Sequence, residues 1–283
     1  MTELDGVPVL RNPVLIAAFE GWNDAADSAS DAVEHLEDVW AALPFAAVDP
    51  DDYYDFQVNR PLVSVDEDGV RRITWPTTRV SIARLEHGPR DVVLVRGIEP
   101  NMRWRSFCEE IVALGQALKV TTVVTLGALL SDTPHSRPVR VTGNAPDEAT
   151  ATALGVEQSR YEGPTGIVGV FADACTQAGW PAASFWAHVP HYAAQAPCPK
   201  ATIALLHRVE DFLDIPIALG ELPEEARAWE HGVDELARED SEVADYVRAL
   251  EDREPEAELP EASGDAIARE FERYLRHRGE PEG

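Results

Sequence analysis

Charged and polar side chains gather in three short segments that each follow an apolar run. These are Glu20, Gly21, Trp22, Asn23 and Asp24 in the first segment, Glu99 and Pro100 in the second, and Asp132, His135 and Arg137 in the third. If folding brings them together, carboxylates beside an imidazole and a guanidinium group could exchange protons with a substrate or hold a metal ion. The alternative is a satisfied ion-pair network, which is the more common role of charged loop clusters. For the first segment alone, a helix cap next to a buried Trp22 is the favoured interpretation.

A fourth segment combines glycines with the start of a predicted helix. It contains Tyr161, Glu162, Gly163, Thr165 and Gly166. Exposed backbone N–H groups at such a helix start could bind an anion. The segment has neither a GxGxxG pattern nor a following GK[ST], so a nucleotide-binding fingerprint is absent. Tight packing of Gly166 and Gly169 against a sheet is the favoured interpretation.

Other catalytic and metal-binding signatures are weak. His188 and His191 have a spacing seen in metal sites, but Pro190 disfavours the helix that would bring the two imidazoles to one face. The sequence contains no CxxC, HExxH or GxSxG motif, which argues against common zinc sites and an ordinary α/β-hydrolase. Cys175 falls in a predicted helix and is expected in the core. We therefore assign no catalytic residue, metal or cofactor from the sequence.

The elements that must position these segments alternate between strand and helix. Residues 14–19, 91–96 and 120–126 are short apolar runs typical of buried strands. Helices are predicted after the first two runs, from about residue 23 or 24 and over residues 102–118. This alternation predicts an α/β fold with a mostly parallel sheet. Because the carboxyl ends of parallel strands lie at one edge of a sheet, the chemistry-bearing segments form one candidate functional cleft.

The remaining elements complete the predicted core. We expect strands at 45–48, 80–85 and 181–189, a hairpin of 62–65 with 70–75 around an Asp-Gly turn, and helices at 165–178 and 199–212. Residues 127–163 are expected to be loop-rich because prolines and glycines recur there.

Composition excludes several classes of function. The 283 residues include 51 acidic and 24 basic ones, giving a formal net charge of −27. Proteins that bind nucleic acid or anionic membrane surfaces usually present basic residues, so this net charge argues against both functions. Three cysteines in no paired motif, and no apolar run long enough for a signal or a membrane span, predict a cytoplasmic location.

The composition changes near residue 222, which suggests two domains. We predict an α/β core domain at 1–221 and an acidic C-terminal helical extension at 222–283, which holds 20 acidic and 8 basic residues. Two apolar stripes predict a helical hairpin there. The first runs from Trp229 to Leu250 and the second from Ile267 to Leu275. The extension could bind a basic partner, although packing against the core or another subunit is the favoured interpretation.

Five motifs together resemble the proteasome assembly chaperone 2 family, in its actinobacterial branch. They are FEGWNDA at 19–25, GIEP at 97–100, GALLSDTPHSRP at 127–138, YEGPTGI at 161–167 and VPHY at 189–192. The resemblance implies a three-layer α/β/α core related to the phosphorylase/hydrolase-like fold, and homo-oligomers. It also implies proteasome subunits as partners.

Two functions from different classes follow. The first is a non-enzymatic chaperone-like or interaction protein that assists proteasome assembly. The second is an enzyme or small-ligand-binding protein that uses the strand-end cleft with His135 and Arg137, an argument by analogy with enzymes of similar fold.

Overall fold

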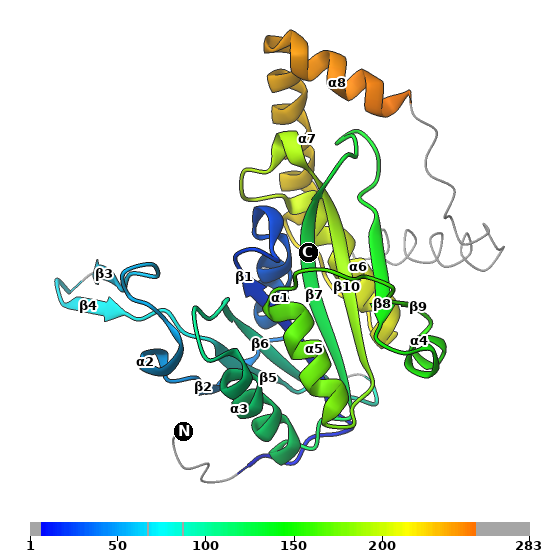
Figure 1. Ribbon diagram of the computed structural model, residues 1–283. Helices are drawn as coiled ribbons and strands as arrows, with labels where there is room; N and C mark the ends of the chain where they lie inside the picture. The colour runs from blue at the N-terminus through cyan, green and yellow to red at the C-terminus, as the bar shows by residue number, and fades with distance from the viewer. Residues whose placement is uncertain (1–6, 67, 87, 253–283) are drawn as a thin grey trace. The chain divides into compact units, whose positions relative to one another are not determined.

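A computed structural model describes residues 7–66, 68–86 and 88–252 of the chain. Its centre is an eight-stranded mixed sheet in the order β2-β5-β6-β1-β7-β10-β8-β9 (Figure 1). The strands are β1 (Val14–Glu20), β2 (Leu43–Ala47), β5 (Arg79–Ala83), β6 (Val92–Ile98), β7 (Thr122–Ser131), β8 (Val141–Ala145), β9 (Glu157–Gln158) and β10 (Ala182–Pro190). The four central strands, β6, β1, β7 and β10, are mutually parallel. This confirms the predicted mostly parallel α/β sheet.

Helices cover both faces of the sheet, which makes the three layers expected from the resemblance. On one face lie α1 (Ser28–Val39) and α6 (Pro199–Leu213), and on the other lie α3 (Trp104–Ala117) and α5 (Ile167–Gln177) (Figure 1). The near-continuous apolar run of β1 fits a strand that is buried on both sides. Its alternate residues serve different cores: Ile16 packs on the α1 side and Phe19 on the α3 side.

The α3 side has an aromatic centre. The ring of Phe19 lies 5.8 Å, centroid to centroid, from the rings of both Phe107 on α3 and Phe171 on α5, in edge-to-face geometry. All three side chains are fully buried. Because such pairs add about 0.5–1.5 kcal/mol beyond their area burial, Phe19 ties the end of β1 to both helices of this layer.

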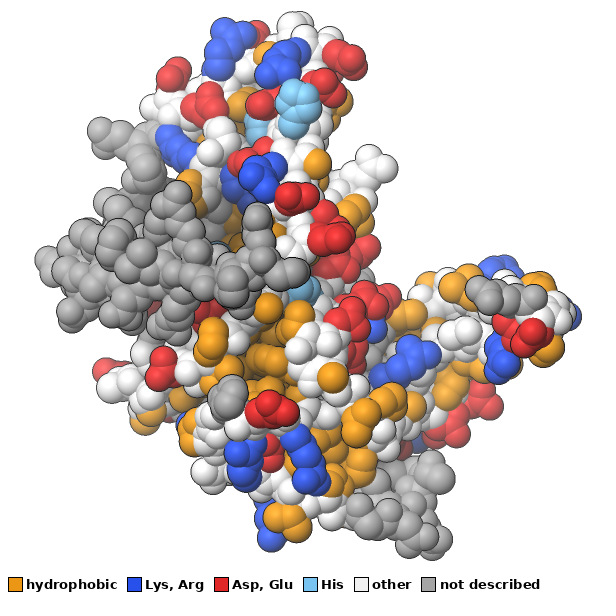
Figure 2. All heavy atoms as spheres, turned by 180° about the vertical axis from the view of Figure 1, so that it is seen from behind, with side chains coloured by type: hydrophobic (Ala, Val, Ile, Leu, Met, Phe, Trp, Pro, Cys, Tyr) orange, Lys and Arg blue, Asp and Glu red, His pale blue; other side chains and the backbone are white. Residues whose placement is uncertain are grey.

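A separate two-stranded hairpin leaves this core. It consists of β3 (Leu62–Val65) and β4 (Arg71–Thr74), paired antiparallel as predicted, and it follows the short helix α2 (Pro50–Tyr53). Figure 1 shows the hairpin projecting away from the large sheet. Six large apolar residues of the hairpin have 45–71% of their surface exposed to solvent: Leu62, Val63, Val65, Val70, Ile73 and Trp75. Figure 2 shows hydrophobic and basic side chains side by side on this projection.

The expectation of a loop-rich segment at 127–163 is wrong. β7 continues to Ser131 because β10 pairs with it residue for residue, up to the pair of Ser131 and Pro190. The segment also holds β8, β9 and the helix α4 (Glu148–Leu154), which begins where the Asp147 carboxylate accepts a hydrogen bond from Thr150 N. Prolines and glycines at the ends of these short elements obscured them in the sequence.

The C-terminal helices begin where the composition changes. α7 (Leu222–Glu239) is followed by α8 (Ser241–Glu251), whose first turn is capped by the Asp240 carboxylate. Two compact units divide at Asp234 and Glu235, inside α7, and the domain boundary predicted at residue 222 stays a prediction. The second predicted stripe, Ile267 to Leu275, lies outside the described residues. Among the described helices, none is long and apolar enough to cross a membrane.

Candidate functional site

The first two predicted segments meet at the carboxyl edge of the central strands. Glu99 N donates a hydrogen bond to the carbonyl oxygen of Glu20 at 2.9 Å, which joins the ends of β6 and β1. Ala128 N on β7 donates to the carbonyl oxygen of Asn23 at 2.8 Å. The parallel order of β6, β1 and β7 produces this meeting, as the strand pattern predicted.

The fourth segment joins the same cluster through the start of α5. Glu99 Oε1 accepts a hydrogen bond from Ile167 N at 2.8 Å, and Asn23 Oδ1 accepts one from Val168 N at 3.3 Å. Both donors belong to the first turn of α5, where backbone N–H groups lack helical partners and favour negative charge. The donors that could have bound an external anion are therefore engaged by the protein's own carboxylate and amide.

Gly166 is required by this arrangement. A Cβ atom there would lie 2.0 Å from Asn23 Oδ1, so any larger residue would displace the amide. The packing partners of Gly166 and Gly169 are the side chains of Asn23 and Thr165, whereas the sequence predicted the sheet itself.

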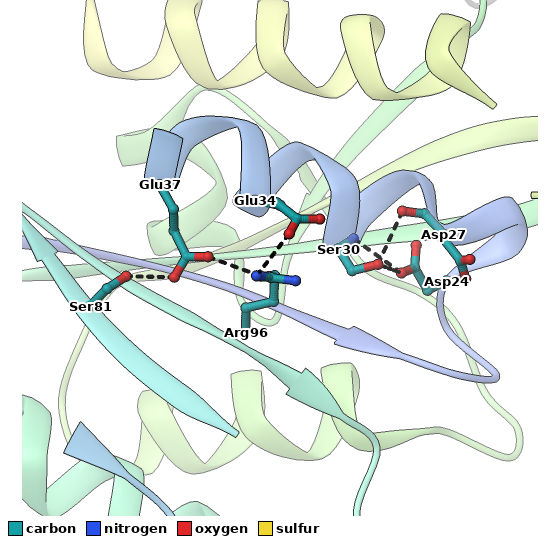
Figure 3. Close-up of polar contacts among 7 residues, drawn as sticks. All are labelled: Asp24, Asp27, Ser30, Glu34, Glu37, Ser81 and Arg96. Carbon is teal, nitrogen blue, oxygen red and sulfur yellow. Dashed lines mark hydrogen bonds and ion pairs between the residues drawn. The ribbon is translucent and has the colours of Figure 1, made fainter. Parts of the chain in front are cut away.

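The side chain of Asp24 satisfies N–H groups in the first turn of the first helix, as a cap would, although Asp27 occupies the N-cap position. The Asp24 carboxylate accepts a hydrogen bond from Ala29 N at 2.6 Å. It also accepts hydrogen bonds from Ser30 N at 3.0 Å and from the Ser30 hydroxyl (Figure 3). Burial raises the pKa of Asp24 to about 6, although the three donors oppose the shift.

Two expectations fail at this turn. Trp22 is 66% exposed, and α1 begins only at Ser28, after a short 3-10 turn in which Ala26 and Asp27 have left-handed backbone angles.

Carboxylates continue along α1 and meet a single arginine. Arg96 on β6 lies 3.2 Å from Glu34 and 3.0 Å from Glu37, and Ser81 Oγ donates to Glu37 at 2.7 Å (Figure 3). Burial, followed by the nearby Asp24 charge, raises the pKa of Asp31 to about 6. Burial also raises the pKa of Glu20. The face of α1 over β6 is thus an ion-pair network with an excess of negative charge.

The third segment is held elsewhere because β7 runs on to Ser131. His135 is 4% exposed; Tyr192 Oη accepts from His135 N at 2.7 Å and lies 2.8 Å from Nδ1. His135 Nε2 lies 3.0 Å from Asp234 Oδ1, and the Trp229 ring stands edge-on to the imidazole. This cluster joins the loop after β7 to residues 229–234 of α7.

The other predicted residues have varied surroundings. Asp132 is exposed and lies 3.4 Å from His191 Nδ1, and Arg137 is partly buried. Tyr161 and Glu162 are exposed, and the Tyr161 hydroxyl donates to the carbonyl of Pro164 at 2.8 Å, next to Gly163. The carbonyl oxygen of Pro100 accepts from Trp104 Nε1, and Gly21 packs against Glu99.

The described residues contain no cluster of metal-ligating side chains and no exposed cysteine. No group of three or more His, Cys, Asp or Glu side chains there could hold a metal ion. Cys108, Cys175 and Cys198 are buried free thiols whose pKa values are raised, chiefly by burial. Burial lowers the pKa of His188, which favours its neutral form.

Sequence reasoning missed a pocket of about 170 Å³ between the hairpin and the ends of β1 and β6. Of the predicted residues, Glu20 lines it. The other lining residues are Arg60, Leu62, Thr74, Trp75, Pro76, Thr77, Arg79, Arg96, Gly97 and Ile98. No motif marks Arg60 or Arg79 in the sequence, and only the tertiary structure brings them to Glu20.

Comparison with known proteins identifies the family. The PAC2 family model matches residues 18–237. A PAC2 family protein from Streptomyces avermitilis has a crystal structure with 62% identity and a TM-score of 0.78, with 83% of this chain and 99% of that one covered. A proteasome-assembly chaperone homologue from Mycobacterium tuberculosis has 56% identity, the same coverage and a TM-score of 0.75.

More distant structures share the fold. An archaeal homologue of proteasome-assembly chaperone from Pyrococcus furiosus has 17% identity and a TM-score of 0.58, with 81% of this chain and 94% of that one covered. No curated protein matches the sequence. The resemblance inferred from five short motifs is confirmed by the family match and by the two actinobacterial structures. The chain therefore belongs to the PAC2 family.

Proposed function

We propose that the protein is a non-enzymatic, chaperone-like interaction protein that binds proteasome subunits and assists their assembly in the cytoplasm. The observation that carries the proposal is its 56% identity to the proteasome-assembly chaperone homologue of Mycobacterium tuberculosis, which it matches over 99% of that protein's length. The match covers 83% of this chain.

The geometry of the predicted cleft supports a role without catalysis. Asn23 and Glu99 cap α5, and Asp24 caps α1. His135 is buried in a hydrogen-bonded cluster with Tyr192 and Asp234. These side chains are engaged in holding elements together, which is the satisfied network considered as the alternative to an acid–base site.

The exposed hairpin β3–β4 offers a surface for a protein partner. Six large apolar side chains between Leu62 and Trp75 face solvent on one short projection. Exposed apolar patches of this kind mark interaction sites, and a lone two-stranded hairpin gains stability when a partner covers it. We assign contact with an unassembled proteasome subunit to this surface.

Mixing purified full-length protein with separately purified proteasome α- and β-subunits of the same organism tests the proposal. Native mass spectrometry would follow complexes with unassembled subunits, and native gels would follow ring formation over time. We expect a complex with free subunits and faster ring formation. Absence of any complex, together with unchanged ring formation, would overturn the proposal.

A matched pair of variants tests the surface. Val63→Thr with Ile73→Thr removes a directly opposed apolar pair and keeps β-branched side chains that suit a strand. Leu130→Thr is the control, since Leu130 is also about half exposed but lies on β7. The double variant should bind subunits more weakly than the control, and equal binding by both would exclude the hairpin.

Self-association is part of the proposal because the family resemblance implies homo-oligomers. Light scattering coupled to size-exclusion chromatography measures the mass of the full-length protein directly. A mass above the 31.0 kDa of one chain is expected, and a mass equal to one chain at working concentration would remove this part.

A further inference from the structure

The pocket at the base of the hairpin carries unbalanced positive charge, although the chain as a whole is strongly acidic. Arg60, Arg79 and Arg96 all line it. Arg96 is paired with two carboxylates of α1. Within the described residues, Arg60 and Arg79 make no ion pair with a carboxylate within 4.0 Å. Glu20 is the one carboxylate among the residues that line the pocket, so Arg60 and Arg79 together outnumber its acidic groups.

The sheet register places two of these charges side by side. Arg79 on β5 and Arg96 on β6 are directly paired across the antiparallel strands. Side chains in such a pair point to the same face with Cβ atoms about 4.5–5.5 Å apart, and like charges there are unfavourable. Glu34 and Glu37 already offset the charge of Arg96, so an added anion would act mainly on Arg79.

One carboxylate limits the charge that the pocket can accept. Glu20, at the end of β1, lines the same space and is only partly exposed. Burial raises the pKa of Glu20, and the charges of Arg96 and Arg79 oppose that rise. Two free guanidinium groups against one carboxylate leave room for a single negative charge, and a dianion would be repelled by Glu20.

The rest of the wall is apolar. Leu62 and Trp75 come from the hairpin, and Pro76 and Ile98 come from the segments beside it. The Trp75 ring is held by an edge-to-face contact with Phe56, with centroids 4.8 Å apart. A volume of about 170 Å³ is below the range of pockets for drug-sized ligands, so it suits a molecule with one small ring or a short carbon chain.

We propose that this pocket binds a small monocarboxylate with an apolar body. The planar guanidinium groups of Arg60 and Arg79 match the two oxygens of a carboxylate, and the body of the ligand lies against Leu62 and Trp75. The ligand differs in kind from a proteasome subunit, although Leu62 and Trp75 belong both to this pocket and to the exposed hairpin surface. Because these two side chains come from the hairpin, an occupant would also join the hairpin to the sheet.

Ligand-observed NMR titration of the full-length protein tests the proposal with three probes. Benzoate has one carboxylate and an apolar ring, benzamide has the ring without the charge, and formate has the carboxylate without the ring. We expect saturable binding of benzoate, and binding of the other two that is weaker by about tenfold or more, as the loss of a charge-assisted hydrogen bond or of ring burial implies. Formate binding as tight as benzoate binding would overturn the assigned ligand class.

Two substitutions and a control locate the site. Arg60→Gln and Arg79→Gln should each weaken benzoate binding by about tenfold, and both residues are exposed enough for the variants to fold. Arg105→Gln removes an exposed arginine from α3, outside the pocket, and should leave binding unchanged. If benzoate binds equally to all of these variants, or does not bind to the wild-type protein, the proposal is wrong. The NMR experiment contains no proteasome subunits. A negative result would therefore overturn the ligand-binding proposal without affecting the proposed role in assembly.

Discussion

Replacing Gly166 with alanine should destabilise the protein through its effect on Asn23. The added Cβ would lie 2.0 Å from Asn23 Oδ1 and 2.7 Å from Cγ, and Asn23 is buried, so the amide must move. Its Oδ1 then no longer accepts the hydrogen bond from Val168 N. An unsatisfied buried N–H costs about 1–3 kcal/mol, and forcing a side chain out of a packed site costs about 1–3 kcal/mol more. The free energy of unfolding should fall by about 2–6 kcal/mol.

A double-mutant cycle separates the clash from the lost hydrogen bond. Asn23→Ala alone leaves the same N–H unsatisfied, at about 1–3 kcal/mol, but removes the group with which the new methyl would collide. Because Gly166 has a φ of −95°, which alanine adopts freely, Gly166→Ala should cost under about 1 kcal/mol in that background. The two substitutions should therefore couple by at least about 1–3 kcal/mol.

Urea-induced unfolding, followed by tryptophan fluorescence and by circular dichroism, measures the four free energies. Gly232→Ala is a suitable control, since it lies in α7 with no atom within 4 Å of the added Cβ, and should stabilise the helix by about 0.5–1 kcal/mol. If the free energies of Gly166→Ala and Asn23→Ala add within about 0.5 kcal/mol, the steric argument is refuted.

Three further substitutions test other parts of the structure. Burial raises the pKa of Asp31 from 3.8 to about 6, so the folded state holds a proton that the unfolded chain releases, and stability falls as pH rises between these values. Asp31→Asn should therefore gain about 1 kcal/mol at pH about 7.5, after discounting for partial exposure, and little at pH about 4; equal gains in urea titrations at both pH values would contradict this. Tyr192→Phe should lower the free energy of unfolding by about 1–2 kcal/mol because His135 N loses its acceptor, and an unchanged urea midpoint would count against the buried cluster. Gly97→Ala would place a Cβ 2.4 Å from the backbone Cα of Thr78, so thermal melts should show a loss of more than about 3 kcal/mol or no cooperative transition, and a wild-type melting temperature would be incompatible with this close approach.

The parallel core was predictable because its signals are local. The apolar run of β1, the stripe of α1 and the Asp-Gly turn of the hairpin each use one periodicity or one turn type, and each element is present, although α1 begins four or five residues later than predicted. The meeting of Glu20 with Glu99 followed from strand order alone, since parallel strands share a carboxyl edge.

The predictions from the sequence were wrong where contacts between distant segments determine the structure. β7 is longer than its apolar run because β10 continues to pair with it up to Ser131, and this extension carries His135 away from the first two segments to a cluster with Asp234. Trp22 is exposed although its size favours burial. The arginine pocket depends on the hairpin folding beside β6, which no local pattern in the sequence encodes.

The internal capping of α5 has a consequence for how the molecule opens. Amide protons in the first turn of a helix usually exchange quickly with solvent, because they have no partner within the helix. In this protein, the amides of Ile167 and Val168 are held by side chains 68 and 145 residues away in the chain. Their hydrogen exchange therefore requires separation of α5 from the ends of β1 and β6, so these two protons report a cooperative opening of the domain and not the fraying of one helix.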